Sequence, residues 1–329
     1  MNILEKTELE LGYIPLLDCI ALLWAEHKGY FNQYGLQVNL VKETSWASLR
    51  DRLAFGFLDA AHCLSAMLPA AAAGHSHLPV VLKAPLVLSQ NRAFISLSQQ
   101  LCYALDIHPQ DSVQQSSAKV VNAIQQGKSI QFAHVFQQSI HHYLLREWLA
   151  LTDPDLAKHI RFSALPPPDM VKAISTQQID GFCVGEPWNI QAQVEGYSHV
   201  VADSQNLIPH NIPDKVLAIT AQWEQQYPNT LKALIQAIEL AQQDLKNKAY
   251  FSEIWQLLQR HQIIRFECSE RIHVSAYYKV QNIIENLAQP PLPMFSGFEW
   301  ISHKMNQWEQ LSLSDSALEA ITQSCLTQQ

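Results

Sequence analysis

The sequence predicts an α/β fold made of largely parallel sheets with helices on both faces. Short apolar segments rich in β-branched residues alternate with amphipathic segments of helical period. Such alternation is typical of βαβ units, in which each helix returns the chain to the next parallel strand. The 329 residues, 48% of them apolar, are enough for about two domains that each bury a core.

Each expected strand is a short apolar run, and each expected helix carries apolar residues three and four positions apart. The expected strands lie at 9–14, 37–41, 60–63, 80–88, 93–97, 130–133, 160–164, 182–184, 199–202 and 215–220. The helices expected between them lie at 19–28, 46–55, 67–73, 118–126, 141–151 and 169–176. Gly74 and Gly127 follow two of these helices, as glycine often does at a helix end. From Ala221 the chain turns helical, with expected helices at 230–246, 251–260, 269–287 and 301–308.

Charge and motif content favour binding over catalysis. The formal net charge of −8 argues against nucleic acid or an anionic membrane as a direct partner. The sequence contains no Gly-x-Ser-x-Gly, Gly-x-Gly-x-x-Gly, phosphate-loop or His-Glu-x-x-His motif. The histidines have no recognised zinc spacing. We therefore expect neither an enzyme nor a bound metal or cofactor.

The first ten residues predict the compartment. They carry three acids and one base, without the basic start and apolar run of a secretory signal. Six scattered cysteines without a Cys-x-x-Cys pair indicate buried thiols in a reducing compartment. The longest nearly apolar stretch, 64–73, is too short to span a bilayer. The expected location is cytoplasmic, or periplasmic if a signal segment has been trimmed.

A strand-to-helix corner is the first candidate for a binding site. The apolar strand 182–184 runs into Gly185-Glu186-Pro187-Trp188, and Pro187 suits the first turn of a new helix. Open α/β sheets place ligands at the carboxyl ends of their strands. A plain turn with a packed tryptophan gives the same pattern, so spacing leaves both interpretations open.

Seven segments in a fixed order carry a family resemblance. They are GYIPLLDC (12–19), ETSWASLRD (43–51), LDAAH (58–62), FAHVF (132–136), REWLA (146–150), PPP (166–168) and CVGEPWN (183–189). Over residues 9–310 the chain resembles the nitrate- and bicarbonate-binding family of solute-binding proteins, especially its cytoplasmic nitrate/nitrite sensor (NasS) branch. The resemblance implies a bilobed periplasmic-binding-protein-like fold of type II with a helical C-terminal region. The implied lobes are 1–88 with 212–329, and 89–211, with the ligand in the cleft between them.

The resemblance also implies a set of ligand contacts. Trp46, with Ser45 as helix cap, would wall the pocket and offer its indole N–H, and His141 and Lys215 would supply further donors. A core tryptophan and an exposed lysine are the alternative interpretations of Trp46 and Lys215. The remaining candidates are Asn91, Arg92, Ser139 and Glu186. His62 is a further candidate because it lies at the end of the third expected strand, and Asp18 lies in the same way at the end of the first.

Two candidates need a separate argument. A carboxylate repels an anion, so Glu186 is expected to bind backbone N–H groups or to pair with a cation. His142, next to the candidate His141, is expected to lie at the surface.

The chain departs from the family at four positions near the expected site. Arg92 replaces a glycine, Ala93 a ligand-contacting amide, Ile140 a threonine, and His142 an acid or amide. Each lost neutral hydrogen bond costs about 1 kcal/mol, although Arg92 offers a charge-assisted contact in return. The ligand therefore need not be nitrate.

Three functions compete at this point. The first is a cytoplasmic nitrate/nitrite sensor that regulates an RNA-binding antiterminator protein. The alternative is the substrate-binding component of an ABC importer for nitrate, bicarbonate or an organic anion. The third is an enzyme on the same scaffold, such as the pyrimidine synthases of thiamine biosynthesis, but those carry a cysteine cluster that this sequence lacks.

Overall fold

Two compact α/β units make up the chain. The computed structural model describes residues 3–74, 80–287 and 293–327. Unit 1 comprises Met1–Gln90, Asn211–Ile264 and Tyr278–Gln329, and unit 2 comprises Asn91–His210 and Arg265–Tyr277. Each unit has its own five-stranded sheet. The lobe limits expected from the sequence stay a prediction.

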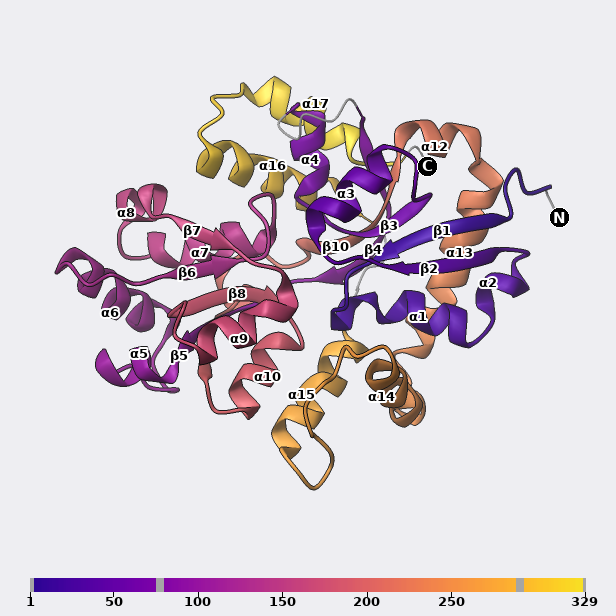
Figure 1. Cartoon of the computed structure of the whole chain (residues 1–329). Coiled ribbons are helices and arrows are strands. Elements are labelled where there is room, and N and C mark those ends of the chain that lie inside the picture. The colour runs from indigo at the N-terminus through magenta and orange to yellow at the C-terminus, as the bar shows by residue number, and fades with distance from the viewer. Residues whose placement is uncertain (1–2, 75–79, 288–292, 328–329) are drawn as a thin grey trace. The chain divides into compact units, whose positions relative to one another are not determined.

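The sheet of unit 1 has the strand order β2-β1-β3-β10-β4 (Figure 1). Its strands are β1 (Glu8–Tyr13), β2 (Gln37–Lys42), β3 (Ala60–Leu64), β4 (Leu82–Gln90) and β10 (Pro213–Thr220). β1 pairs in parallel with β2 and β3, whereas β10 runs antiparallel to β3 and β4. The carboxyl ends of β1 to β4 and the start of β10 therefore share one edge, which is the edge where α/β sheets bind ligands.

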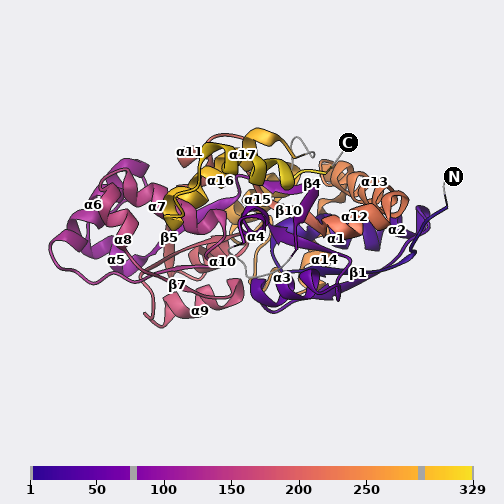
Figure 2. The same ribbon diagram turned by 90° about the horizontal axis from the view of Figure 1, so that it is seen from above.

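Helices of unit 1 pack in two groups. They are η1 (Leu17–Cys19), α1 (Ile20–His27), α2 (Tyr30–Gln33), α3 (Trp46–Ala54), α4 (Met67–Ala72), α12 (Ala221–Gln226), α13 (Pro228–Asp244), η3 (Lys248–Tyr250), α14 (Phe251–Arg260), α16 (Phe295–Glu309) and α17 (Asp315–Ser324). α1, α2 and α13 pack against one another, and α16 and α17 lie side by side and contact α4 (Figure 2). Among the helices that the structure describes, none combines the length and apolar character needed to cross a bilayer.

The sheet of unit 2 repeats this plan with the order β7-β6-β8-β5-β9. Its strands are β5 (Ala93–Ser98), β6 (Phe132–His134), β7 (Phe162–Ala164), β8 (Gly181–Gly185) and β9 (Ser198–Asp203). β6 pairs in parallel with β7 and β8, and β5 runs antiparallel to β8 and β9. The start of β5 thus shares an edge with the carboxyl ends of the other four strands.

The helices of unit 2 are mostly short. They are α5 (Gln99–Ala104), α6 (Val113–Gln125), α7 (Ile140–Ala150), α8 (Pro154–His159), η2 (Pro167–Asp169), α9 (Met170–Ser175), α10 (Trp188–Val194) and α11 (Ser204–Leu207). α7 packs against both α6 and α8 (Figure 1). One further helix, α15 (Val274–Glu285), begins in unit 2 and continues into unit 1 at Tyr278.

The predicted α/β class is confirmed, with a refinement of its sheets. Each sheet is mixed because one strand runs against the other four: β10 in unit 1 and β5 in unit 2. Helices α2, α5, α8, α11, α12 and α17 were not expected from the sequence. α8 has a clear start signal, with Asp153 as its cap and Pro154 in its first turn, but its six residues are too few to show a helical period.

Gly181 allows the central strand of the unit 2 sheet to pack closely. A Cβ at this position would lie 2.7 Å from Leu97 Cδ2 and 2.8 Å from Phe132 Cε1. Because that atom would overlap its neighbours, Gly181→Ala is expected to lower the free energy of unfolding by about 1–3 kcal/mol, measured by urea denaturation. In a Phe132→Leu background the ring edge is gone and the cost should shrink. An equal cost in both backgrounds would show that the ring contact is not the cause.

Candidate functional site

The edge of the unit 1 sheet at which β1 to β4 end gathers six buried residues around one ammonium group. They are Asp18 after β1, Trp46 at the start of α3, His62 in β3, Ser89 near the end of β4, and Asp214 and Lys215 at the start of β10. Each is at most 3% exposed. Pairing of Lys215 with Leu64 and with Ser89 in the sheet brings these strands together. We call these six residues the Lys215 cluster.

Asp18 is the acceptor that holds the cluster together. His62 Nε2 lies 2.8 Å from Asp18 Oδ1, and Ser89 Oγ donates to Asp18 Oδ2 at 3.0 Å. The backbone N–H of Ile14 donates to His62 Nδ1 at 3.4 Å. Because Nδ1 accepts, Nε2 carries the ring proton and donates it to Asp18.

Lys215 is held between two carboxylates. Its Nζ donates to Asp214 Oδ1 at 2.8 Å and lies 3.4 Å from Asp18 Oδ2. The side chain of Lys215 is fully buried, which excludes the alternative interpretation as an ordinary exposed lysine. A buried ammonium needs such compensation, since moving a charge without a partner from water into the protein interior costs several kcal/mol.

The pKa values of the two carboxyl groups are shifted in opposite directions. Burial acts to raise the pKa of Asp18, but the charge of Lys215 and the hydrogen bonds from His62 and Ser89 hold it below its ordinary value. Burial raises the pKa of Asp214 above its ordinary value; Lys215 opposes this shift and Asp18 adds to it. Burial acts to lower the pKa of Lys215, and the two carboxylates raise it overall. Asp18 therefore favours its ionised form more than an exposed aspartate does, and Asp214 favours it less.

Trp46 brings an unused donor to the cluster. Its ring centroid lies 5.8 Å from Lys215 Nζ and 5.7 Å from the His62 ring centroid. Ser45 caps α3 by accepting from the Ser48 N–H at 3.1 Å, as predicted, and so places Trp46 in the first turn. Trp46 Nε1 is buried and has no hydrogen-bond partner among the described residues. A buried donor without a partner is uncommon in proteins.

In unit 2, Ser139 and His141 lie at the start of α7. Ser139 Oγ accepts from the His142 N–H at 3.1 Å and donates to the Phe136 carbonyl at 2.5 Å. Ser139 is therefore a helix cap in this structure. His141 is fully buried.

The prediction that His142 lies at the surface is wrong, because its ring packs into the core of unit 2. Its exposed fraction is 6%. Its ring centroid lies 4.8 Å from that of His134, and its Nε2 accepts from Arg146 Nε at 3.3 Å. The Arg146 guanidinium also stacks on the Phe162 ring, 4.6 Å from its centroid, and donates to the Ala157 carbonyl. The spacing of apolar residues could not predict the burial of His142, because its neighbours His141 and Tyr143 are buried as well and α7 therefore has no polar face at this point.

Burial keeps both histidines of this core neutral. Burial lowers the pKa of His134 to about 4, in spite of the bond from its Nδ1 to the Phe136 carbonyl at 2.8 Å. Burial also holds the pKa of His142 well below its ordinary value, and electrostatic interactions with the His134 ring and the Arg146 guanidinium lower it further. Charging either ring would therefore cost folding free energy.

Glu186 has the backbone role expected for it. Its Oε2 accepts from the Ile190 N–H at 2.9 Å, within the first turn of α10. The peptide bond between Glu186 and Pro187 is cis. Trp188 is fully buried, and the Arg265 guanidinium lies 5.2 Å from its ring centroid.

Asn91 and Arg92 precede β5 at the same edge of the unit 2 sheet. Asn91 Nδ2 donates to the Pro209 carbonyl at 2.9 Å and to the Ser204 carbonyl at 3.4 Å, so its amide joins two chain segments of this unit. Burial lowers the pKa of Arg92, and Asp203 opposes this shift. Ala93 is fully buried, with its N–H donating to Ser204 Oγ at 3.2 Å.

The structure thus brings three candidates together in unit 1 and places the other five in unit 2. Trp46, His62 and Lys215 meet in the Lys215 cluster. Of the other five, Asn91 and Arg92 precede β5, and Ser139, His141 and Glu186 follow β6 and β8. The roles of all eight as ligand contacts stay predictions. Asp214 and Ser89 were not singled out from the sequence, although the adjacency of Asp214 to Lys215 was an available signal.

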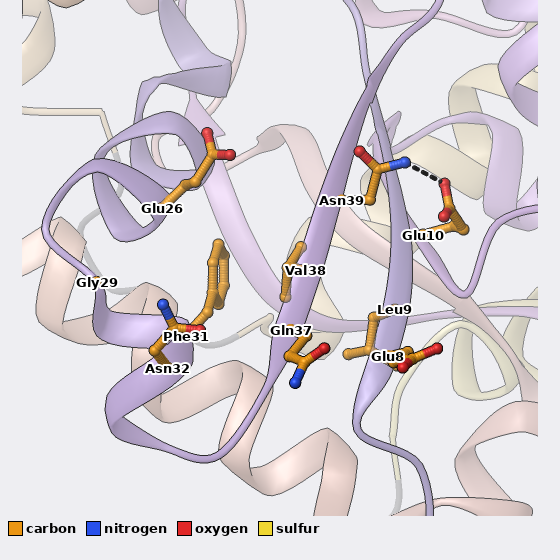
Figure 3. Close-up of a pocket in the computed structure, with 10 residues that line it drawn as sticks. All are labelled: Glu8, Leu9, Glu10, Glu26, Gly29, Phe31, Asn32, Gln37, Val38 and Asn39. Carbon is orange, nitrogen blue, oxygen red and sulfur yellow. Dashed lines mark hydrogen bonds between the residues drawn. The ribbon is translucent and has the colours of Figure 1, made fainter.

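A groove of about 440 Å³ lies at the other end of β1 and β2. Figure 3 shows Glu8, Glu10 and Glu26 around it, with the Asn39 amide donating to Glu10 at 2.8 Å. Three acidic side chains disfavour an anion, so this groove is not a candidate anion site. Among the described residues, no three histidine, cysteine or acidic side chains are placed to hold a metal ion.

Comparison with known proteins identifies the family. The profile of the NMT1-like family matches residues 3–259. The nitrate import ATP-binding protein NrtC of Synechocystis sp. PCC 6803 is 37% identical over 241 residues, covering 72% of this chain and 35% of NrtC. The bicarbonate transport ATP-binding protein CmpC of the same organism is 36% identical over 239 residues, 71% of this chain and 34% of CmpC. The nitrate/nitrite binding protein NrtA of Nostoc sp. PCC 7120 is 32% identical over 246 residues, 73% of this chain and 54% of NrtA.

A solved structure confirms the predicted fold. The periplasmic nitrate-binding protein NrtA from Synechocystis PCC 6803 superposes with a TM-score of 0.83 at 22% identity, covering 98% of this chain and 86% of NrtA. The architecture is therefore the bilobed periplasmic-binding-protein-like fold. This chain spans between about a third and a half of the length of the three relatives named above. By its match over residues 3–259, the chain belongs to the NMT1-like family.

Proposed function

We propose that this chain binds a small oxyanion at the Lys215 cluster, without catalysis, as the solute-binding part of an import system for nitrate, bicarbonate or a similar anion. The observation that carries the proposal is the unpartnered, buried N–H of Trp46 beside the Lys215 ammonium. A small oxyanion supplies the acceptor that this N–H lacks, and charge-assisted hydrogen bonds of this kind are strong.

Relatives support the class of ligand. NrtA is named for binding nitrate and nitrite, and NrtC and CmpC are named for nitrate import and bicarbonate transport. All three names refer to small planar oxyanions. This chain contains no phosphate-loop motif. We therefore assign the ATP binding of NrtC and CmpC to the parts of those proteins that this chain does not cover.

Anion sensing is the second candidate function. Its support is that the relatives at 36–37% identity are ATP-binding proteins, of which this segment forms about a third. A region similar to this chain is thus also joined to a protein named for ATP binding. In such an arrangement, anion binding to this region can regulate the ATP-binding part. The antiterminator partner and the cytoplasmic location stay predictions, and recovery of an RNA-binding protein that anions release in pull-down would support them.

Trp46→Phe tests the proposed site. The change keeps an aromatic ring but removes the indole N–H, and hydrogen bonds to charged groups contribute about 1.5–3 kcal/mol. We therefore expect the dissociation constant for the bound anion to rise about ten- to a hundredfold. Isothermal titration with nitrate, nitrite and hydrogencarbonate, with chloride as a blank, measures this.

Trp300→Phe is the matched control, since Trp300 lies in α16 of the same unit and outside the Lys215 cluster. Its affinities should equal those of the wild type. Wild-type protein that binds none of the three anions would refute the function, and Trp46→Phe with unchanged affinity would refute the site.

A further inference from the structure

We propose that an anion binds at the Lys215 cluster only when Asp214 carries a proton, so that the site takes up an anion and a proton together. This inference rests on the proposed function and specifies how that site is regulated. It follows from the number of charges in the cluster and from the hydrogen-bond partners of its two carboxylates.

The charges of the cluster leave no surplus of positive charge for an anion. One ammonium, Lys215 Nζ, faces Asp214 Oδ1 at 2.8 Å and Asp18 Oδ2 at 3.4 Å. The ring of His62 adds no positive charge in this arrangement, because its Nδ1 accepts from the Ile14 N–H. With both carboxylates ionised the cluster has a net charge of −1, and a bound monoanion would make it −2. Burial makes such an excess costly, and proton uptake is the usual relief.

Hydrogen-bond partners identify Asp214 as the carboxylate that takes the proton. Both oxygens of Asp18 already accept hydrogen bonds, from His62 and from Ser89. Asp214 Oδ1 accepts from Lys215, whereas Asp214 Oδ2 is buried without a hydrogen-bond partner among the described residues. A proton on Oδ2 therefore leaves every existing bond of the cluster in place. Burial also raises the pKa of Asp214 and lowers its preference for the charged form.

Other titratable groups around Asp214 do not replace it in this role. The titratable groups that act on Asp214 are Lys215, Asp18 and His62. Beyond these, Cys63 in β3 interacts with Lys215 and Arg50, and Cys19 interacts with Asp18. Burial raises the pKa of Cys63 to about 12 and that of Cys19 further, so both stay thiols near neutral pH. Arg50 pairs with Asp51 at 2.7 Å.

Nitrate is the suitable probe because it has no titratable group near neutral pH. In the wild type, the dissociation constant for nitrate, measured over pH 6–10, should be constant while Asp214 keeps its proton and should rise about tenfold for each pH unit once Asp214 ionises. Titration calorimetry in buffers of different ionisation enthalpy should show uptake of about one proton per nitrate in the upper range.

Asp214→Asn is the decisive variant, since asparagine has the shape of aspartic acid and stays neutral. Its affinity for nitrate should be constant over pH 6–10, and binding should be accompanied by no proton uptake. Asp51→Asn, which removes one partly exposed carboxylate of the same unit, should keep the wild-type pH profile.

The outcomes separate the two proposals. Wild-type nitrate binding that is constant over pH 6–10 without proton uptake would overturn the proton coupling alone, as would a wild-type pH profile retained in Asp214→Asn. If Asp214→Asn does not fold, proton uptake by the wild type still decides. Absence of nitrate, nitrite and hydrogencarbonate binding at every pH would instead overturn the proposed function itself.

Discussion

Replacing Lys215 by methionine is expected to lower the free energy of unfolding by about 3–5 kcal/mol and to abolish anion binding. Methionine has a similar length but no charge. Asp18 and Asp214 would then lie buried next to each other without the ammonium that now contacts both at 3.4 and 2.8 Å. Removing one partner from a buried ion pair costs more than the pair itself contributes, because the remaining charge stays desolvated.

Urea denaturation measures the loss, and a second substitution tests its cause. Lys215→Met combined with Asp214→Asn removes one of the two unpaired charges, so it should recover part of the stability but none of the anion binding. Lys232→Met in α13 is the matched control, because Lys232 is exposed; it should leave the free energy of unfolding within about 0.5 kcal/mol. If Lys215→Met cost no more than this control, the buried charge balance described for the cluster would be wrong.

Lowering the pH from 7 to 4 is expected to reduce the free energy of unfolding by about 3 kcal/mol through His134 alone. Burial lowers the pKa of His134 from 6.5 to about 4 in the folded protein. Between these two values the unfolded chain binds the proton and the folded chain does not. The stabilisation by the neutral ring is therefore fully present above pH 6.5 and is lost as the pH falls toward 4. The lowered pKa of His142 acts in the same direction.

His134→Asn isolates this contribution. The asparagine amide can replace the Nδ1 donor that bonds the Phe136 carbonyl, but it does not titrate. Urea unfolding at pH 7, 6, 5 and 4 should show a shallower loss of stability in this variant than in the wild type. His210→Asn, at an exposed position of the same unit, should follow the wild-type curve. Parallel curves for His134→Asn and wild type would contradict a neutral, buried His134.

Much of the architecture could be predicted because it depends on local signals. Short apolar runs marked the strands, and a serine before an amphipathic segment marked the start of α3. Helix α8 escaped detection because it is too short for a period to show. The reversed strands β5 and β10 could not be expected either, since an apolar run has the same pattern in both directions.

The candidate site was predictable only in part. Trp46 and Lys215 were found through the family resemblance, and His62 through its place in the third expected strand. The burial of His142 was missed, since its position in the sequence does not show that Phe162 and Arg146 pack around it. Asp214 was not singled out, and its adjacency to Lys215 does not reveal its burial, since a carboxylate beside a lysine is usually an ordinary surface pair.

By itself the sequence determined the α/β class, the approximate course of most strands and helices, and the family. Those properties depend on residue pattern along the chain, which folding does not change. Only the tertiary structure decided which charges face one another: Asp18, His62 and Lys215 are up to 197 positions apart in the chain, yet they are in hydrogen-bond or ion-pair contact. The electrostatics of a site depend on distance and burial in space. For that reason only the structure shows that one ammonium faces two carboxylates. The proposed anion binding depends on this balance of charges.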